Sequence, residues 1–267
     1  MPSHSAKLIT LDEDFSLETS KNDVIIRSLK SNKILFSTNE LARKNFQTQL
    51  KNSGGFGLYY QEDYRVLSLV GPFLSLKYHV YSVGEKNGIG VGAHPAEETR
   101  YVSIDLRRPE LLSKRLFALY EGAHSNQKNM LKLTDIFSEK EVLAALLADK
   151  IISEPLLRAN IRVKSTKQLI QELFHGPLPE PLCGEYDDSL LNAFVFHHLE
   201  GGKVAVRISV SGAGPCRNNL TELGILLPIP ALWRSDFNLA QKGKAGFLQR
   251  SQRQKDLKAV SYEFEHK

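Results

Sequence analysis

The chain has 267 residues, of which 42% are hydrophobic and 24% are charged, and its formal net charge is +5. These values are ordinary for a globular protein with one large domain or two smaller ones. No apolar run approaches the roughly 18 residues that a membrane-spanning helix requires, and the first residues contain no apolar segment typical of a signal peptide. We therefore expect neither a transmembrane segment nor a signal peptide in the chain as given.

Short elements are predicted in residues 1–60. Residues 23–29 and 33–37 are rich in apolar and β-branched side chains, which predicts two strands. Ser37 and Glu40 then have the spacing of a capping box, and apolar residues recur at helical spacing before the sequence NSGG. This region can belong to the same fold as the rest of the chain.

Two strand patterns follow. Residues 73–83 alternate between apolar and polar side chains after a break at Gly71-Pro72, and residues 99–106 alternate again. Each pattern predicts a strand with one buried face.

The stretch NGIGVGAHP lies between these strands. Gly88, Gly90 and Ala93 match the spacing G-x-G-x-x-A of a dinucleotide-binding turn. That turn requires a helix directly after it, whereas a strand pattern follows here. We therefore predict that Gly88, Gly90 and Gly92 permit a hairpin or bulge and that no cofactor is bound.

Helices are predicted in the middle of the chain. Residues 109–119 carry an apolar stripe, with Gly122 at the C-terminal cap. A capping box beginning at Ser138 precedes an apolar pattern that continues to Ile151, and residues 165–175 predict a further helix.

Strands return after a proline-rich connector. Residues 192–212 predict a hairpin that turns at Gly201-Gly202, and residues 221–230 predict another short strand. Strands thus dominate both ends, and no βαβ alternation persists. These patterns favour an α+β fold in which helices pack on a largely antiparallel sheet.

The last residues carry much of the basic excess. We divide the chain into residues 1–60, a main domain at residues 61–240 and a basic C-terminal tail at residues 241–267. Such a tail is either solvated or contacts acidic surfaces. Only Phe247 interleaves its basic run, so nucleic acid binding is not expected.

Metal binding is not expected either. Cys183 and Cys216 do not have the paired spacing of a zinc site, and whether they form a disulfide or remain separate thiols stays open. His197 and His198 are neighbours on a predicted strand, so we expect their side chains to point to opposite faces.

The order of three motifs resembles the extracytoplasmic domain family of RsiV-type lysozyme-sensing anti-sigma factors and PdaC-type cell-wall deacetylases. The motifs are Gly92-Ala93-His94, Asp105-Leu106 and the turn at residues 133–137, within a resemblance that spans roughly residues 60–235. It implies an extracytoplasmic location, periplasmic or secreted, and a bacterial cell-envelope ligand, either a lysozyme-like protein or a peptidoglycan-related glycan. Residues 109–130 are an insertion relative to the family, and the deacetylase domain is missing, so deacetylation is not implied.

Three side chains, those of His94, Asp105 and Trp233, are candidates for binding. His94 can present its ring as a polar contact or ligand, or it can hydrogen-bond a neighbouring strand or Asp105 and fix the loop. Trp233 can be an exposed anchor for a partner or a single core tryptophan. Asp135 is interpreted as a turn residue that orders the entrance of the next helix.

The sequence contains no G-x-S-x-G motif, no H-E-x-x-H motif and no cysteine beside a persuasive histidine partner. We therefore expect a non-catalytic binding module, with the partner class that the resemblance implies. One alternative is a hydrolase that acts on an envelope polymer, with His94 and a carboxylate as the working pair. Another is a secreted or cytoplasmic interaction protein that reuses this domain and makes contact through its basic tail.

Overall fold

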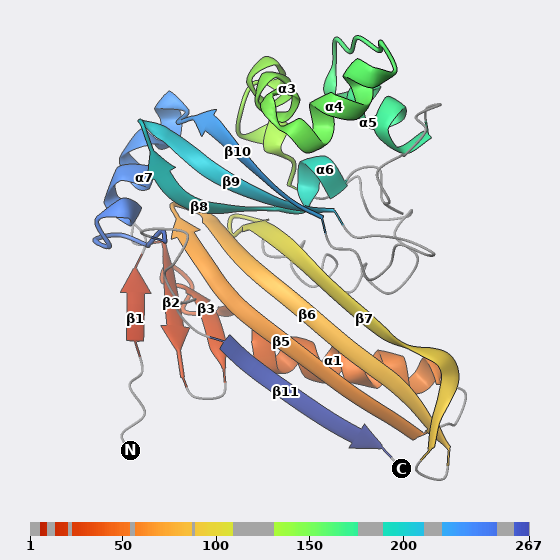
Figure 1. The fold of residues 1–267 in the computed structure, drawn as a ribbon. Coiled ribbons are helices and arrows are strands. Elements are labelled where there is room, and N and C mark those ends of the chain that lie inside the picture. Colours follow the sequence, from red (N-terminus) through yellow and green to blue (C-terminus); the bar gives the residue numbers. More distant parts are fainter. Residues whose placement is uncertain are drawn as a thin grey trace.

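The computed structural model describes residues 6–9, 14–20, 23–53, 57–86, 89–108, 131–175, 189–210, 221–249 and 259–266. In these residues three antiparallel sheets combine with helices, so the protein has the predicted α+β fold (Figure 1). None of the described helices is long and apolar enough to cross a membrane.

The N-terminal sheet has the strand order β1-β2-β3-β4 and leads directly into helix α1 (Thr38–Asn52). Its strands are β1 (Ala6–Ile9), β2 (Phe15–Thr19), β3 (Val24–Ser28) and β4 (Ile34–Ser37). The two predicted strands and the helix are therefore confirmed. Ser37 is the N-cap of α1, where its side chain accepts a hydrogen bond from the backbone amide of Glu40.

The largest strands form a second sheet in the order β11-β5-β6-β7. Its members are β5 (Gly57–Val70), β6 (Phe73–Lys86), β7 (Ile89–Asp105) and β11 (Ala259–His266). Strands β5 and β6 turn at Gly71-Pro72 as predicted, and β6 and β7 pair in antiparallel register up to Lys86 and Ile89. The described part of the glycine-rich stretch, residues 89–95, therefore lies in the second strand of an antiparallel pair.

Two predicted boundaries differ from the structure. The division at residues 60 and 61 falls inside β5, so the N-terminal region shares an element with the main sheet. Residues 259–266, expected to be part of a tail, form β11 and pair with the edge of β5, where Val260 lies opposite Tyr64. The reason is that alternate side chains of this segment, Val260 and Tyr262, are buried against the sheet.

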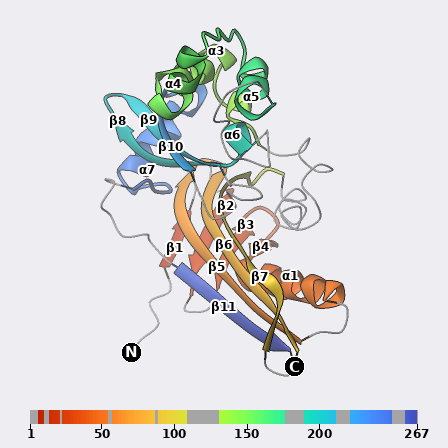
Figure 2. The same cartoon turned by 45° about the vertical axis from the view of Figure 1, so that its right-hand side comes forward.

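A third sheet, in the order β10-β9-β8, lies across the ends of β5, β6 and β7 (Figures 1 and 2). It consists of β8 (Phe194–Glu200), β9 (Lys203–Val210) and β10 (Thr221–Pro228). Strands β8 and β9 turn at Gly201 and Gly202, whose φ angles of +55° and +75° suit glycine. The predicted hairpin and the following strand are confirmed.

Helices cover this third sheet. They are η2 (Leu133–Asp135), α3 (Glu139–Ala148), α4 (Lys150–Arg158), α5 (Thr166–His175), α6 (Ser189–Asn192), η4 (Ala231–Trp233) and α7 (Arg234–Gln241). The capping box at Ser138 is present, but the helix predicted to continue to Ile151 is wrong. Asp149 adopts extended backbone, ends α3 and caps α4 by accepting from the backbone amide of Ile151.

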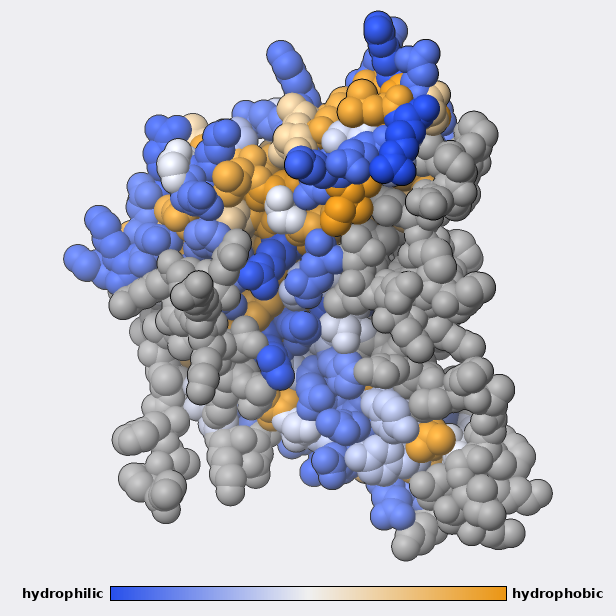
Figure 3. All heavy atoms as spheres, viewed as in Figure 1, coloured by the Kyte–Doolittle hydropathy of each residue, from blue (hydrophilic) through white to orange (hydrophobic). Residues whose placement is uncertain are grey.

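Two main clusters of buried hydrophobic residues form the core. One joins the third sheet to the helices above it, and the other joins the second sheet to α1 and the N-terminal sheet. In the view of Figure 3, apolar residues reach the surface mainly in the upper, helix-covered part of the molecule.

Serine side chains connect the second and third sheets. The hydroxyl of Ser103 donates to the carbonyl of Phe194 (2.7 Å), and the hydroxyl of Ser75 accepts from the backbone amide of Phe196 (3.2 Å). The two serine hydroxyls are also 3.1 Å apart. The prediction of one buried face is therefore wrong at this end of β6 and β7, because strand β8 covers their polar side chains.

Candidate binding site

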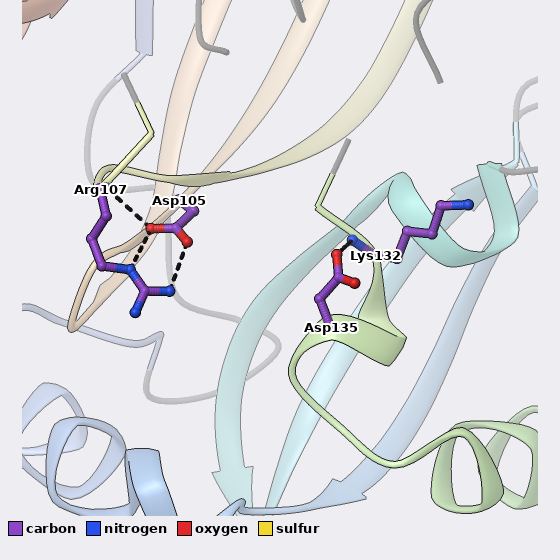
Figure 4. Close-up of polar contacts among 4 residues, drawn as sticks. All are labelled: Asp105, Arg107, Lys132 and Asp135. Carbon is purple, nitrogen blue, oxygen red and sulfur yellow. Dashed lines mark hydrogen bonds and ion pairs between the residues drawn. The ribbon is translucent and has the colours of Figure 1, made fainter. Parts of the chain in front are cut away.

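Asp105 and Arg107 form an ion pair at the end of β7 (Figure 4). Arg107 Nε lies 2.8 Å from Asp105 Oδ1, and Arg107 Nη2 lies 2.7 Å from Asp105 Oδ2. The backbone amide of Arg107 also donates to Asp105 Oδ1, at 3.0 Å. The hydrogen bonds to Asp105 raise the pKa of the Arg107 guanidinium above its usual value, against a smaller lowering by burial. The guanidinium is therefore charged and fixed in orientation.

Aromatic rings hold the same guanidinium from a different direction. Its central carbon lies 5.2 Å from the ring centroid of Trp233 and 5.7 Å from that of Phe73. The two rings themselves meet at 5.0 Å with an interplanar angle of 76°. Arg107 therefore connects two of the three predicted candidates, Asp105 and Trp233, in a single arrangement.

Exposure differs sharply among these residues. The side chain of Asp105 is only 7% exposed, whereas that of Arg107 is 52% exposed. Trp233 is partly buried and packs against the core, so it is neither fully exposed nor a simple core residue. Leu232, its chain neighbour, is 77% exposed. We call Arg107, Trp233 and Leu232 the Arg107 surface.

Further positive charge lies close in the chain. Arg108 follows Arg107, Arg234 follows Trp233, and both residues are exposed. Within three residues of Arg107 or Trp233, the carboxylates in the described part of the chain are those of Asp105 and Asp236, and both are buried. The exposed charged groups among these described residues are therefore guanidinium groups.

Asp135 is placed differently, in η2 (Figure 4). Its Oδ2 accepts from the backbone amide of Lys132 at 2.8 Å. The turn buries Leu133 and Phe137 below it and ends where Ser138 caps α3. The interpretation of Asp135 as a turn residue is confirmed.

His94 lies in the backbone of β7, and the position of its side chain is outside what the structure describes. The register excludes one of its proposed partners. Asp105 is opposite Phe73 at one end of β7, whereas His94 is near the other end, roughly 36 Å away at about 3.3 Å per residue. A hydrogen bond between His94 and Asp105 is therefore excluded.

Other predicted features lie partly or wholly outside the described residues. Gly90 and Gly92 are in β7. The features outside are Gly88, Gly122, residues 109–130, Cys183 and Cys216.

The expectation for His197 and His198 is wrong. The register of β8 against β9 shifts between Phe196 and His198, and this β-bulge places the two rings together. Their Nδ1 atoms are 2.7 Å apart, which is a hydrogen-bond distance. Across the described part of the chain, no group of three or more histidine, cysteine or acidic residues is arranged to hold a metal.

One cluster was missed at the sequence level. Glu62 is completely buried and accepts hydrogen bonds from the amide of Asn45 and from the hydroxyls of Tyr60, Tyr64 and Tyr78. The period of two in β5 could have revealed it, because Tyr60, Glu62 and Tyr64 share one face. Glu62 is not exposed to solvent, and its hydrogen bonds connect core elements, so we interpret the cluster as structural.

Arg107 was also missed as a candidate residue. Its nearest signal was its position two residues after Asp105, a spacing at which a carboxylate can accept from a nearby backbone amide. The contact with Trp233 has no sequence signal, because it joins residues far apart in the chain. Comparison of the chain with protein-family models, with curated proteins and with solved structures found no match.

Proposed function

We propose that this protein is a non-catalytic binding module of the bacterial cell envelope and that it recognises its partner through the Arg107 surface. The observation that carries the proposal is the half-exposed side chain of Arg107, whose guanidinium is fixed by Asp105 and lies over the ring of Trp233. The resemblance to envelope sensor and accessory domains supplies the partner class and the extracytoplasmic location.

The composition of the surface supports a role in binding. Arginine and tryptophan are enriched among the residues that dominate binding energy at protein interfaces. Here the arginine is already ordered, so a partner does not have to restrict its long side chain. The 77% exposed side chain of Leu232 offers apolar area beside it.

Charge favours one partner over the other. The chain carries a net charge of +5, and Arg108 and Arg234 are exposed beside the Arg107 surface. A positive surface favours a partner with acidic groups. Peptidoglycan carries carboxylates on its peptides, so we favour the peptidoglycan-related ligand over a lysozyme-like protein.

The hydrolase alternative has less support. It requires a carboxylate beside His94, but Asp105 lies near the opposite end of β7 and is engaged by Arg107. Glu62 has no exposed surface on which a polymer could bind. We therefore do not assign catalysis to either carboxylate.

The test is sedimentation of the protein with purified peptidoglycan, alongside a pull-down on an immobilised c-type lysozyme. We expect retention on peptidoglycan that Leu232→Asp weakens. Leu157→Asp is the matched control, because Leu157 is 75% exposed but lies on α4.

Three results contradict the proposal. Retention on neither material contradicts the envelope assignment. Equal retention of both variants contradicts the role of the Arg107 surface. Release of soluble sugar or peptide from the peptidoglycan contradicts a non-catalytic function.

A further inference from the structure

We propose that a carboxylate group of the ligand binds the outer edge of the Arg107 guanidinium. This inference rests on the proposed function, because it names the chemical group that the Arg107 surface recognises. It adds to the proposed function that the ligand group is a carboxylate and that its donors are the N–H groups of Arg107.

The geometry of the ion pair leaves that edge open. A guanidinium has five N–H donors. Asp105 takes one edge, with Nε 2.8 Å from Oδ1 and Nη2 2.7 Å from Oδ2. The donors that remain are the two N–H groups of Nη1 and the second N–H group of Nη2. Among the described residues, no side chain or carbonyl accepts from these three donors.

The open edge matches a carboxylate. On this edge one N–H of Nη1 and one of Nη2 point in parallel, at the spacing of the two oxygens of a carboxylate. A neutral amide offers a single oxygen and lacks the charge, so it forms a weaker contact. The planar fork of donors therefore selects a planar, charged, two-oxygen acceptor.

The surroundings keep the edge in place and accessible. Asp105 holds one edge of the guanidinium, and the rings of Phe73 and Trp233 contact it from a different direction. The side chain of Arg107 is 52% exposed, so solvent reaches it beside these contacts. An acidic ligand thus meets donors that are already oriented, which lowers the entropy lost on binding.

Trp233 provides a direct readout, because it is the only tryptophan in the chain. Its fluorescence can be titrated with a tetraglutamate peptide blocked at both ends, with the matched tetraglutamine peptide and with inorganic phosphate. We expect a saturable change with tetraglutamate, no change with tetraglutamine and a weaker, non-saturating response to phosphate.

Variants locate the site. Arg107→Gln is expected to weaken tetraglutamate binding by about tenfold or more. Arg107→Lys is expected to restore only part of it, because lysine keeps the charge but lacks the fork. Arg107→Gln leaves the buried carboxylate of Asp105 unpaired, which can destabilise the fold. The double variant Asp105→Asn/Arg107→Gln is therefore measured as well, because it removes the guanidinium without leaving that charge unpaired. Arg43→Gln, on the exposed side of α1, is the matched control and is expected to bind as the wild type does.

Several outcomes overturn the inference: equal responses to both peptides, equal saturable responses to tetraglutamate and phosphate, or unchanged tetraglutamate binding in the double variant.

Failure of the proposed function gives different results. Tetraglutamate binding that depends on Arg107, without retention on peptidoglycan or lysozyme, supports the inference and contradicts the envelope assignment. Retention on peptidoglycan that does not depend on Arg107 supports the envelope assignment and contradicts the inference.

Discussion

The side-chain amide of Asn45 donates a hydrogen bond of 2.6 Å to Oε1 of Glu62, inside the core. This contact joins helix α1 to strand β5, and three tyrosine hydroxyls complete the donors around the carboxylate. Burial raises the pKa of Glu62 above its usual value, and the hydrogen bonds oppose this effect only in part. The carboxyl group therefore couples the attachment of α1 to the protonation state of a core residue.

The first prediction concerns pH. Because the pKa of Glu62 is higher in the folded state than in the unfolded state, protonation favours folding. This contribution is complete below the unfolded-state pKa, about 4.3 for glutamate, and is lost as the pH rises through the folded-state value. We therefore expect Glu62→Gln to become increasingly stable relative to the wild type as the pH rises from about 4 towards neutral.

Urea unfolding of the wild type and of Glu62→Gln across this pH range measures how the free energy of unfolding differs between them. Glu154→Gln is the control, since Glu154 is exposed on α4, and its curve is expected to run parallel to that of the wild type. A difference between Glu62→Gln and the wild type that stays constant with pH would contradict the prediction.

A second prediction concerns the hydroxyl groups around this carboxylate. Tyr64 donates to Oε2 of Glu62 at 2.7 Å, and both residues are fully buried. Tyr64→Phe leaves a buried oxygen without this donor, so we expect the free energy of unfolding to fall by about 1–3 kcal/mol. Tyr59→Phe removes a partly exposed hydroxyl on the same strand and is expected to change it by less than about 0.5 kcal/mol. Equal losses of unfolding free energy in the two variants, measured by denaturant unfolding, would contradict a stabilising role for the hydrogen bond from Tyr64 to Glu62.

Much of the fold follows from local patterns. The strands, the hairpin at Gly201-Gly202 and the caps at Ser37 and Ser138 all depend on side chains within a few residues of one another. Such signals are readable in the sequence, because period and capping are local properties.

The errors arise where a distant contact or a single residue overrides the pattern. The apolar spacing through Ile151 hides the break at Asp149. An aspartate at this position can lie inside one long helix, or its side chain can cap a new helix, as it does here. The alternation in β8 hides the bulge at His197. At the candidate site, Asp105 and Trp233 were both named, but their connection through Arg107 depends on tertiary packing that no spacing reveals.

A third prediction concerns Gly246. Its φ angle is +83°, and a Cβ atom at this position would lie 2.2 Å from the carbonyl oxygen of Leu69. Gly243 also has a positive φ angle, +65°, but its Cβ position is open. Gly243→Ala therefore bears only the cost of the left-handed conformation, about 1–2 kcal/mol. Gly246→Ala also displaces the pairing of Phe247 with Leu69, and we expect a total loss of about 3 kcal/mol or more. Thermal unfolding of the two variants measures this difference, and equal midpoints would contradict the close contact.

The last prediction distinguishes a strand from a tail at the C-terminus. The Tyr262 hydroxyl lies 2.6 Å from Thr38 Oγ1, and the Tyr262 ring meets that of Tyr64 edge to face at 6.1 Å. Tyr262→Ala removes this packing from the β11 edge, so we expect the free energy of unfolding to fall by about 3 kcal/mol. Ser261→Ala, its exposed neighbour, is expected to change it by less than about 0.5 kcal/mol. If both variants unfold at the wild-type denaturant midpoint, residues 259–266 behave as a solvated tail. If only Tyr262→Ala is destabilised, this segment completes the sheet that holds Glu62 and α1.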